Sequence, residues 1–175
     1  MRKVLYFLGE FNDQDIDWIV GTAARTPVKQ GETVVVEGRR VETVSIVITG
    51  KLTVMTGKAV VAEIGSGEVV GEMSFLDSRP PSASVVAKED SLLLSIPTTR
   101  LAGKLKSDLG FASRFYKALG VLLAFRLRDS TAQMAYGREK RLDQEFDANE
   151  VDPDMLDRIS LAALRFDRII QGALS

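Results

Sequence analysis

The chain has 175 residues, of which 45% are hydrophobic and 27% are charged, and its formal net charge is −1. This length and composition fit one globular domain, or one domain with a helical appendage. The near-neutral charge argues against a nucleic-acid binder, which is usually basic. The sequence has no Cys and no His, so disulfides, thiolate metal sites, a Ser-His-Asp triad and ordinary zinc sites are excluded. We expect no resident metal or cofactor and no enzyme.

No apolar run approaches the roughly 18 residues that a membrane-spanning helix needs. The N-terminus begins basic and then apolar, as a signal peptide does. However, the apolar run Val4–Leu8 is too short, and no small-residue cleavage site follows it. We therefore expect a cytoplasmic protein without a membrane partner.

The first predicted element is a short helix from Asp13 to Ala24. Asn12 is a suitable N-cap, and acidic residues fill the first turn. Ile16 and Ile19 lie on one apolar face of this helix.

Short runs rich in β-branched residues follow from Thr26 onwards, and glycines separate most of them. Seven or eight strands of this kind predict a mainly β fold with added helices. We expect an antiparallel β-roll, either a jelly roll or a small barrel, with a short N-terminal helix and C-terminal helices. The predicted strands include residues 33–36, 43–48, 52–55, 59–64, 84–87 and 91–96.

The segment from Gly65 to Ala87 reads as a strand, a glycine turn, one short helical turn, a loop and a strand. Gly71 and Glu72 begin the short helix. Free N–H groups at a helix start suit an anionic ligand such as a phosphate. Glu72 is placed to accept a hydrogen bond from a sugar hydroxyl, and Ser82 offers a hydroxyl from the opposite wall.

Two parts of this segment, Val70–Ser74 and Ser82–Val85, resemble the phosphate-binding cassette of cyclic nucleotide-binding domains. The turn glycines Gly31, Gly38 and Gly50 occur in the order and at the approximate spacing of that family. The resemblance extends from about Leu8 to Leu127. It implies the β-roll fold and a ligand of the cAMP or cGMP type. A tight turn at Gly50 also has its own physical reason, because φ > 0 costs glycine little.

The resemblance assigns Glu72 to the ribose hydroxyl. It assigns the phosphate to the N–H groups of Met73, Ser74 and Ala83 and to the Ser82 hydroxyl. The arginine with which this family pairs the cyclic phosphate falls on Pro81, and proline cannot replace it. Arg79 is either a substitute or a solvated loop charge, and we favour the second. The predicted site residues are Gly71, Glu72, Met73, Ser74, Arg79, Ser82, Ala83 and Ser84.

Helical patterns follow Pro97, and either Thr98 or Thr99 is expected to cap a helix over Arg100–Ser107. A long helix from Asp108 to Ala135 carries an apolar seam that includes Phe111, Phe115 and Phe125. This seam either docks on the roll or forms a homodimer, and its aromatic residues are candidates for contact with a purine. Arg126 and Arg128 are expected to be surface charges.

A charged stretch precedes Asp152-Pro153, which is a clear helix start. The last helix is amphipathic, so it either folds back on the roll or pairs with another subunit. We divide the chain into the roll (1–107), the long helix (108–136), a charged linker (137–151) and the C-terminal helix (152–175).

The residues after the long helix do not form the pattern of a helix-turn-helix, so we expect no DNA partner. The sequence favours a stand-alone sensor or regulatory module that binds a cyclic nucleotide and signals through its C-terminal helices to a homodimer or a partner protein. The alternative is a β-roll scaffold that binds no nucleotide and acts in oligomerisation or protein docking. Pro81 favours this alternative, whereas the Gly71-Glu72 pair favours the sensor.

Overall fold

The computed structural model describes residues 7–136 and 153–174. The predicted charged linker, residues 137–151, lies outside the described residues. The helices are α2 (Asp13–Thr22), α3 (Glu72–Asp77), α4 (Thr98–Ser107), α5 (Leu109–Tyr136) and α6 (Pro153–Leu174). The strands are β1 (Ala24–Val28), β2 (Thr33–Val35), β3 (Thr43–Thr49), β4 (Leu52–Thr56), β5 (Ala59–Ile64), β6 (Val69–Val70), β7 (Ser84–Ala87) and β8 (Ser91–Pro97).

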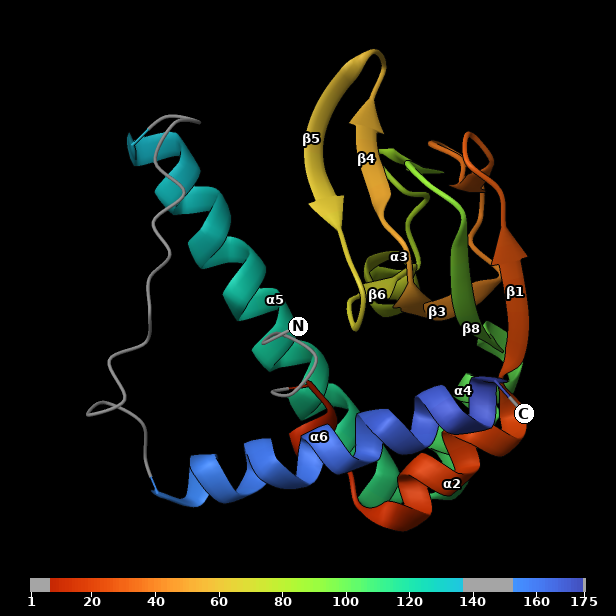
Figure 1. The fold of residues 1–175 in the computed structure, drawn as a ribbon, viewed down its shortest axis with the longest axis vertical. Coiled ribbons are helices and arrows are strands. Elements are labelled where there is room, and N and C mark those ends of the chain that lie inside the picture. The colour runs from red at the N-terminus through yellow and green to blue at the C-terminus, as the bar shows by residue number, and fades with distance from the viewer. Residues whose placement is uncertain (1–6, 137–152, 175) are drawn as a thin grey trace.

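The strands form two antiparallel four-stranded sheets, with the orders β1-β8-β3-β6 and β2-β7-β4-β5. The two sheets face each other, and the helices gather around one end of the roll (Figure 1). The predicted antiparallel β-roll with a short N-terminal helix and C-terminal helices is therefore confirmed, although the described helices contain more residues than the strands. A closed barrel is not present, because no hydrogen-bonded ladder between described strands joins one sheet to the other.

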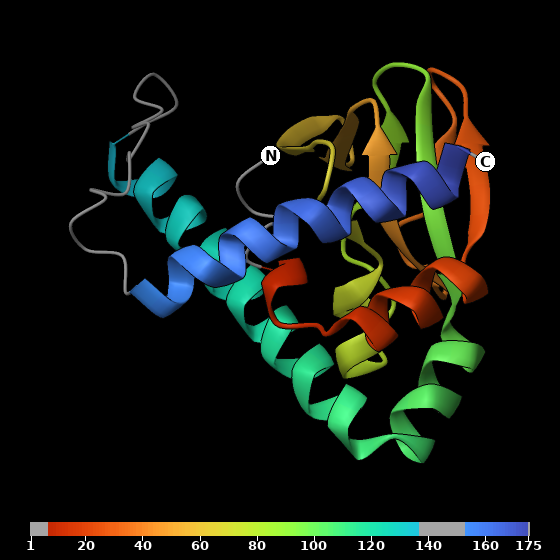
Figure 2. The same cartoon turned by 60° about the horizontal axis from the view of Figure 1, so that its bottom comes forward.

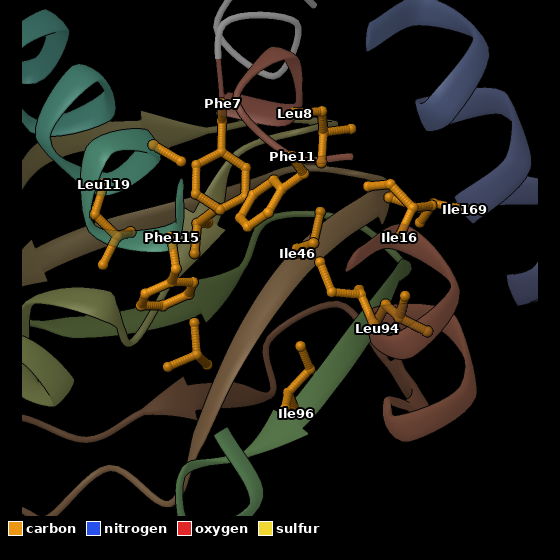
Figure 3. Packing of buried hydrophobic residues seen from close by; sticks show 14 of the residues in the cluster. Phe7, Leu8, Phe11, Ile16, Ile46, Leu94, Ile96, Phe115, Leu119 and Ile169 are labelled. Atoms are coloured by element: carbon orange, nitrogen blue, oxygen red, sulfur yellow. The ribbon is translucent and has the colours of Figure 1, made fainter. Parts of the chain in front are cut away.

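Two apolar clusters hold the fold together. One lies between the two sheets and includes Val47, Leu52 and Leu93. The other lies between the first sheet and the helices, and joins Ile46 and Ile96 of the sheet to residues of α2, α5 and α6 (Figure 3). β3 serves both clusters because successive side chains of a strand point to opposite faces.

The N-terminal helix α2 begins as predicted. Asn12 and Asp15 form a capping box, with each side chain accepting from the other's backbone N–H at 2.9 Å. The predicted end at Ala24 is wrong, because the helix stops at Thr22 and Ala24 pairs with Ser95 in β1. The sheet pairing of residue 24 therefore outweighs its helix propensity.

The helix α2 is also fastened to α5. The buried Asp15 receives two hydrogen bonds from Arg114, at 2.6 and 2.9 Å. Two bonds from one guanidinium to one carboxylate fix the geometry as well as the charge. This pair holds the N-terminal helix against the base of α5.

The predicted helix after β8 is present as α4, but its capping prediction is wrong. Pro97 is the N-cap, and no side chain caps the first turn. Thr98 instead lies inside the helix, and its N–H donates to the Glu42 carbonyl at 2.9 Å. The start of α4 is thus fixed by a tertiary hydrogen bond rather than by a local cap.

The C-terminal helix α6 folds back and packs along α2 (Figure 2). Its apolar residues Ala162, Phe166 and Ile169 are buried there. Arg165 and Arg168 pair with Asp13 and Asp17 of α2, at 3.1 and 2.6 Å. Helix α6 therefore covers the N-terminal helix. Among the described residues, no helix is long and apolar enough to cross a membrane.

Candidate ligand-binding site

We call residues 70–85 the cassette. It contains the end of β6, the helix α3, a loop and the start of β7. β6 belongs to the first sheet and β7 to the second, so the cassette joins the two sheets at one end of the roll. All eight predicted site residues lie in this segment.

Gly71 is the N-cap of α3 and has φ +88°. A Cβ atom placed on it would lie 2.4 Å from the Thr43 carbonyl oxygen and 3.0 Å from Cγ1 of Val41. Both the left-handed backbone and the close approach to β3 require glycine at this position. The predicted role of Gly71 at the helix start thus has a structural reason that is independent of any ligand.

Glu72 is the first residue of α3, and its side chain is buried, with 2% relative exposure. Its Oε1 accepts a hydrogen bond from Nη1 of Arg126 on α5. The other terminal nitrogen of Arg126 donates to the Val69 carbonyl at 2.6 Å. One guanidinium therefore binds the cassette helix and the strand that leads into it.

Burial raises the pKa of the Glu72 carboxyl above its ordinary value. The charge of Arg126 and its hydrogen bond act in the opposite direction and lower the pKa, but they only partly offset the cost of burial. A carboxylate in this environment gains from any further hydrogen-bond donor. A sugar hydroxyl is one such donor.

The prediction that Arg126 is a surface charge is wrong, because three quarters of its side chain is buried and it is paired with Glu72. Sequence reasoning missed this residue. The available signal was its spacing: Arg126 lies four residues after the buried Leu122, and therefore on the same face of α5.

Met73 and Ser74 occupy the first turn of α3, where N–H groups have no partner within the helix. Met73 is 60% exposed, and Ser74 is half-buried. The helix has only six residues, so its dipole is small. Binding of an anion here therefore depends mainly on hydrogen bonds from the individual N–H groups. Met73 and Ser74 therefore offer hydrogen-bond donors to a phosphate, but no positive charge.

The opposite wall is the loop before β7. Ser82 is exposed and Ala83 is half-buried. The Ser84 hydroxyl accepts from the Glu37 N–H at 3.0 Å, so its predicted contact with a ligand competes with a structural hydrogen bond. The Pro81 carbonyl accepts from the Gly38 N–H at 2.9 Å. Two hydrogen bonds from the segment between β2 and β3 thus hold the loop that precedes β7.

Arg79 lies beside a neighbouring carboxylate, that of Asp77. Its backbone N–H donates to Oδ1 of Asp77 at 3.0 Å, and its guanidinium lies 3.9 Å from the same carboxylate. The Arg79 side chain is 84% exposed. Its position is that of a solvated loop charge, the alternative that the sequence favoured.

The predicted aromatic candidates differ in how accessible they are. Phe111 and Phe115 are buried in the helical core, with their rings stacked at 5.9 Å. Phe75 of α3 packs edge-on against Phe115 at 6.1 Å. Only Phe125, which is half-buried, remains partly accessible to a purine.

Helix α3 therefore touches α5 at two points. One is the Phe75–Phe115 contact and the other is the Glu72–Arg126 pair. Positions 115 and 126 are eleven residues apart, which is about three turns of an α-helix. The cassette helix is thus fixed to α5 over this length.

A family model described as the cyclic nucleotide-binding domain matches residues 25–108. Residues 25–108 belong to the cyclic nucleotide-binding domain family. The match contains strands β2 to β8, most of β1 and the whole cassette, so the resemblance predicted from the glycines and the cassette is confirmed. No curated protein matches the chain.

Solved structures support the same assignment. The catabolite activator protein of Thermus thermophilus is 27% identical, with a TM-score of 0.59, over 71% of this chain and 59% of that one. A cyclic nucleotide-binding domain from Methylobacillus flagellatus shares the fold at 20% identity, with a TM-score of 0.68, over 80% and 85%. The chain thus spans about three fifths of the Thermus protein.

A third similar structure is the regulator CLP of Xanthomonas campestris, described as c-di-GMP responsive. It is 25% identical, with a TM-score of 0.62, over 71% of this chain and 65% of that one. The domain fold thus also occurs in a regulator that is described as responding to a cyclic dinucleotide. The described residues contain no group of three or more acidic side chains that would hold a metal ion.

Proposed function

We propose that the domain binds a cyclic mononucleotide, cAMP or cGMP, in the cassette and acts as a sensor or regulatory module. The observation that carries the proposal is the buried Glu72 at the start of α3, held by one arginine of α5. Membership of the family supports the class of ligand. The geometry of the cassette supports its position.

In this proposal the ribose hydroxyl donates to Glu72. The N–H groups of Met73, Ser74 and Ala83 and the Ser82 hydroxyl face the phosphate. The family's arginine is absent at Pro81, so the site lacks one charge-assisted pair. Such a pair contributes about 1.5–3 kcal/mol, and its absence weakens binding by about one to two decades.

Signalling follows from the contacts of α3 with α5. A ligand hydroxyl at Glu72 competes with Arg126 for the same carboxylate, and movement of α3 also displaces Phe75 from Phe115. The expected result is a shift of α5 relative to the roll. Exposed apolar residues in the far half of α5 (Leu127) and on α6 (Leu164) offer a surface for a second copy or a partner protein.

Titration calorimetry with cAMP and with cGMP tests the proposal. The wild type is expected to bind at least one of the two saturably, and Glu72→Ala is expected to abolish the heat of binding. Glu89→Ala is the matched control, because Glu89 is an exposed carboxylate in the loop between β7 and β8. Circular dichroism checks that each variant is folded.

The scaffold alternative makes the opposite prediction. If the wild type binds neither nucleotide up to millimolar concentration while the protein still assembles, the roll acts as a docking or oligomerisation module. Sedimentation of wild type and Glu72→Ala side by side measures that assembly. A nucleotide that binds the Glu72→Ala variant as tightly as the wild type would also contradict the proposal.

A further inference from the structure

A second feature of the roll lies away from the predicted site residues. A cavity of about 430 Å³ opens between the two sheets, beside β1 and β2. β1 and β2 are the edge strands of their sheets, so no neighbouring described strand fills the space between them. None of the eight predicted site residues lines this cavity. Its size is within the range of small-molecule sites.

The floor of the cavity carries hydroxyl groups. Thr26, Thr43, Ser45 and Ser95 line it, and the two serines are buried, with 2% and 6% exposure. Ser45 and Ser95 lie directly opposite each other on β3 and β8. The interior face of a roll is otherwise apolar, and burying hydroxyls there costs free energy unless they are hydrogen-bonded.

Three contacts join the four hydroxyls and leave part of their hydrogen-bonding capacity unused. Thr26 and Ser45 contact Ser95 Oγ at 3.0 and 2.9 Å. Thr43 Oγ1 lies 3.4 Å from Ser45 Oγ, which is longer than an ordinary O–H···O hydrogen bond. These contacts use at most three of the four protons. Each buried side-chain oxygen among the described residues thus has at least one hydrogen-bond partner, and at least one proton and several lone pairs of the four hydroxyls remain for a ligand.

The other residues that line the cavity indicate which kind of ligand it can hold. Val28, Val34 and Leu93 supply apolar surface, and Glu32 is the one charged residue in the lining. A lining with a carboxylate and no cation disfavours phosphates and other anions. Hydroxyl groups both donate and accept hydrogen bonds, so they are complementary to the hydroxyl groups of a ligand.

A peptide strand is a poorer occupant. β1 is an exposed edge for such an addition, but Pro27, the fourth of its five residues, has no N–H to donate. The cavity thus favours a small molecule over an added strand.

We propose that this cavity is a second binding site, for a small neutral polyhydroxylated molecule such as a monosaccharide or a cyclic polyol. Its hydroxyls exchange hydrogen bonds with Thr43 and with the Thr26–Ser95–Ser45 group, and its carbon skeleton contacts the apolar wall. This inference does not rest on nucleotide binding at the cassette.

Amide NMR spectra of the 175-residue chain, titrated with D-glucose, D-ribose and myo-inositol, test this proposal. At least one probe is expected to shift the amides of Thr26, Ser45 and Ser95 saturably, with a dissociation constant of about 10 mM or below. The amides of Gly71–Ser74 report separately on the cassette, and cAMP is titrated in parallel. If the Gly71–Ser74 amides do not respond to cAMP but the cavity amides respond to a sugar or polyol, the cassette proposal is contradicted and the cavity proposal is not.

Two variants sharpen the test. Thr43→Val and Thr26→Val remove one hydroxyl each from different parts of the floor at nearly constant volume, and both are expected to weaken the bound probe by about fivefold or more. Thr53→Val is the control, because Thr53 lies on β4 and does not line the cavity. The inference is overturned if none of the three probes binds the wild type. It is also overturned if both floor variants bind as the wild type does.

Discussion

Arg126 of α5 is hydrogen-bonded to the buried carboxylate of Glu72, 54 residues earlier in the chain. The pair connects the first residue of the cassette helix to the long C-terminal helix. The residue with the clearest predicted role toward a ligand is thus also hydrogen-bonded to α5. The coupling that we propose between ligand binding and the position of α5 runs through this pair and the Phe75–Phe115 contact.

Removing Arg126 leaves a buried carboxylate without its cation. Arg126→Met is expected to lower the free energy of unfolding by on the order of 3 kcal/mol, because the uncompensated charge remains in a site with 2% exposure. The double variant Arg126→Met/Glu72→Gln removes the charge as well and should recover a large part of the loss. Urea denaturation measures all three proteins. A double variant less stable than Arg126→Met would contradict this account.

The raised pKa of Glu72 gives a pH dependence with a definite sign. Because the folded-state pKa is above the ordinary 4.5, the native state binds the proton more tightly than the unfolded chain does. The stability that protonated Glu72 contributes is complete below about pH 4.5 and is lost as the pH rises through the folded-state value. Relative to Glu72→Gln, the wild type should therefore lose stability over that interval and level off above it. A difference that grows in favour of the wild type with rising pH would show that Arg126 dominates instead.

Gly71 and Gly31 have nearly the same φ, +88° and +86°, but different surroundings. A Cβ on Gly31 meets nothing within 4 Å, whereas a Cβ on Gly71 meets the Thr43 carbonyl at 2.4 Å. Gly31→Ala should cost about 1–2 kcal/mol from the left-handed backbone alone. Gly71→Ala should cost about 1–3 kcal/mol more because of the clash. Thermal unfolding compares the two, and equal losses would mean that β3 moves aside at little cost.

Pro81→Arg restores the cation that the family carries in its cassette. It is expected to tighten cAMP or cGMP binding by about one to two decades, through a charge-assisted pair with the phosphate. Arg79→Ala is the control and should have little effect, because Arg79 is exposed and pairs with Asp77. Calorimetry measures both. An unchanged affinity in Pro81→Arg would place the phosphate away from this loop.

The sequence predicted those parts of the fold whose signals are local. The β-branched runs and turn glycines predicted most strands, and Asn12 predicted the start of α2. The end of α2 and the cap of α4 were wrong because tertiary pairing decides them, at Ala24–Ser95 and at Thr98–Glu42. Pro27 concealed β1, since proline is tolerated in an edge strand but is not typical of one.

The sequence predicted the site residues within the cassette but not the contribution of α5. The Gly71-Glu72 pair and the Ser82–Ser84 loop lie close together in sequence, so a motif can find them. Arg126 contributes from a helix more than 50 residues away, and only the folded chain shows what it contacts. The cavity floor was likewise invisible, because Thr26, Ser45 and Ser95 come from three strands that are not consecutive.

The side-chain Nε–H resonance of Arg126 tests the central claim most directly. It is recorded by ¹H–¹⁵N NMR while cAMP or cGMP is added, and Arg126→Met supplies its assignment. The account predicts a saturable shift of this resonance together with the amides of Met73 and Ser74, as the ligand reaches Glu72. If neither nucleotide changes these signals up to millimolar concentration, the cassette is not a cyclic nucleotide site in this protein.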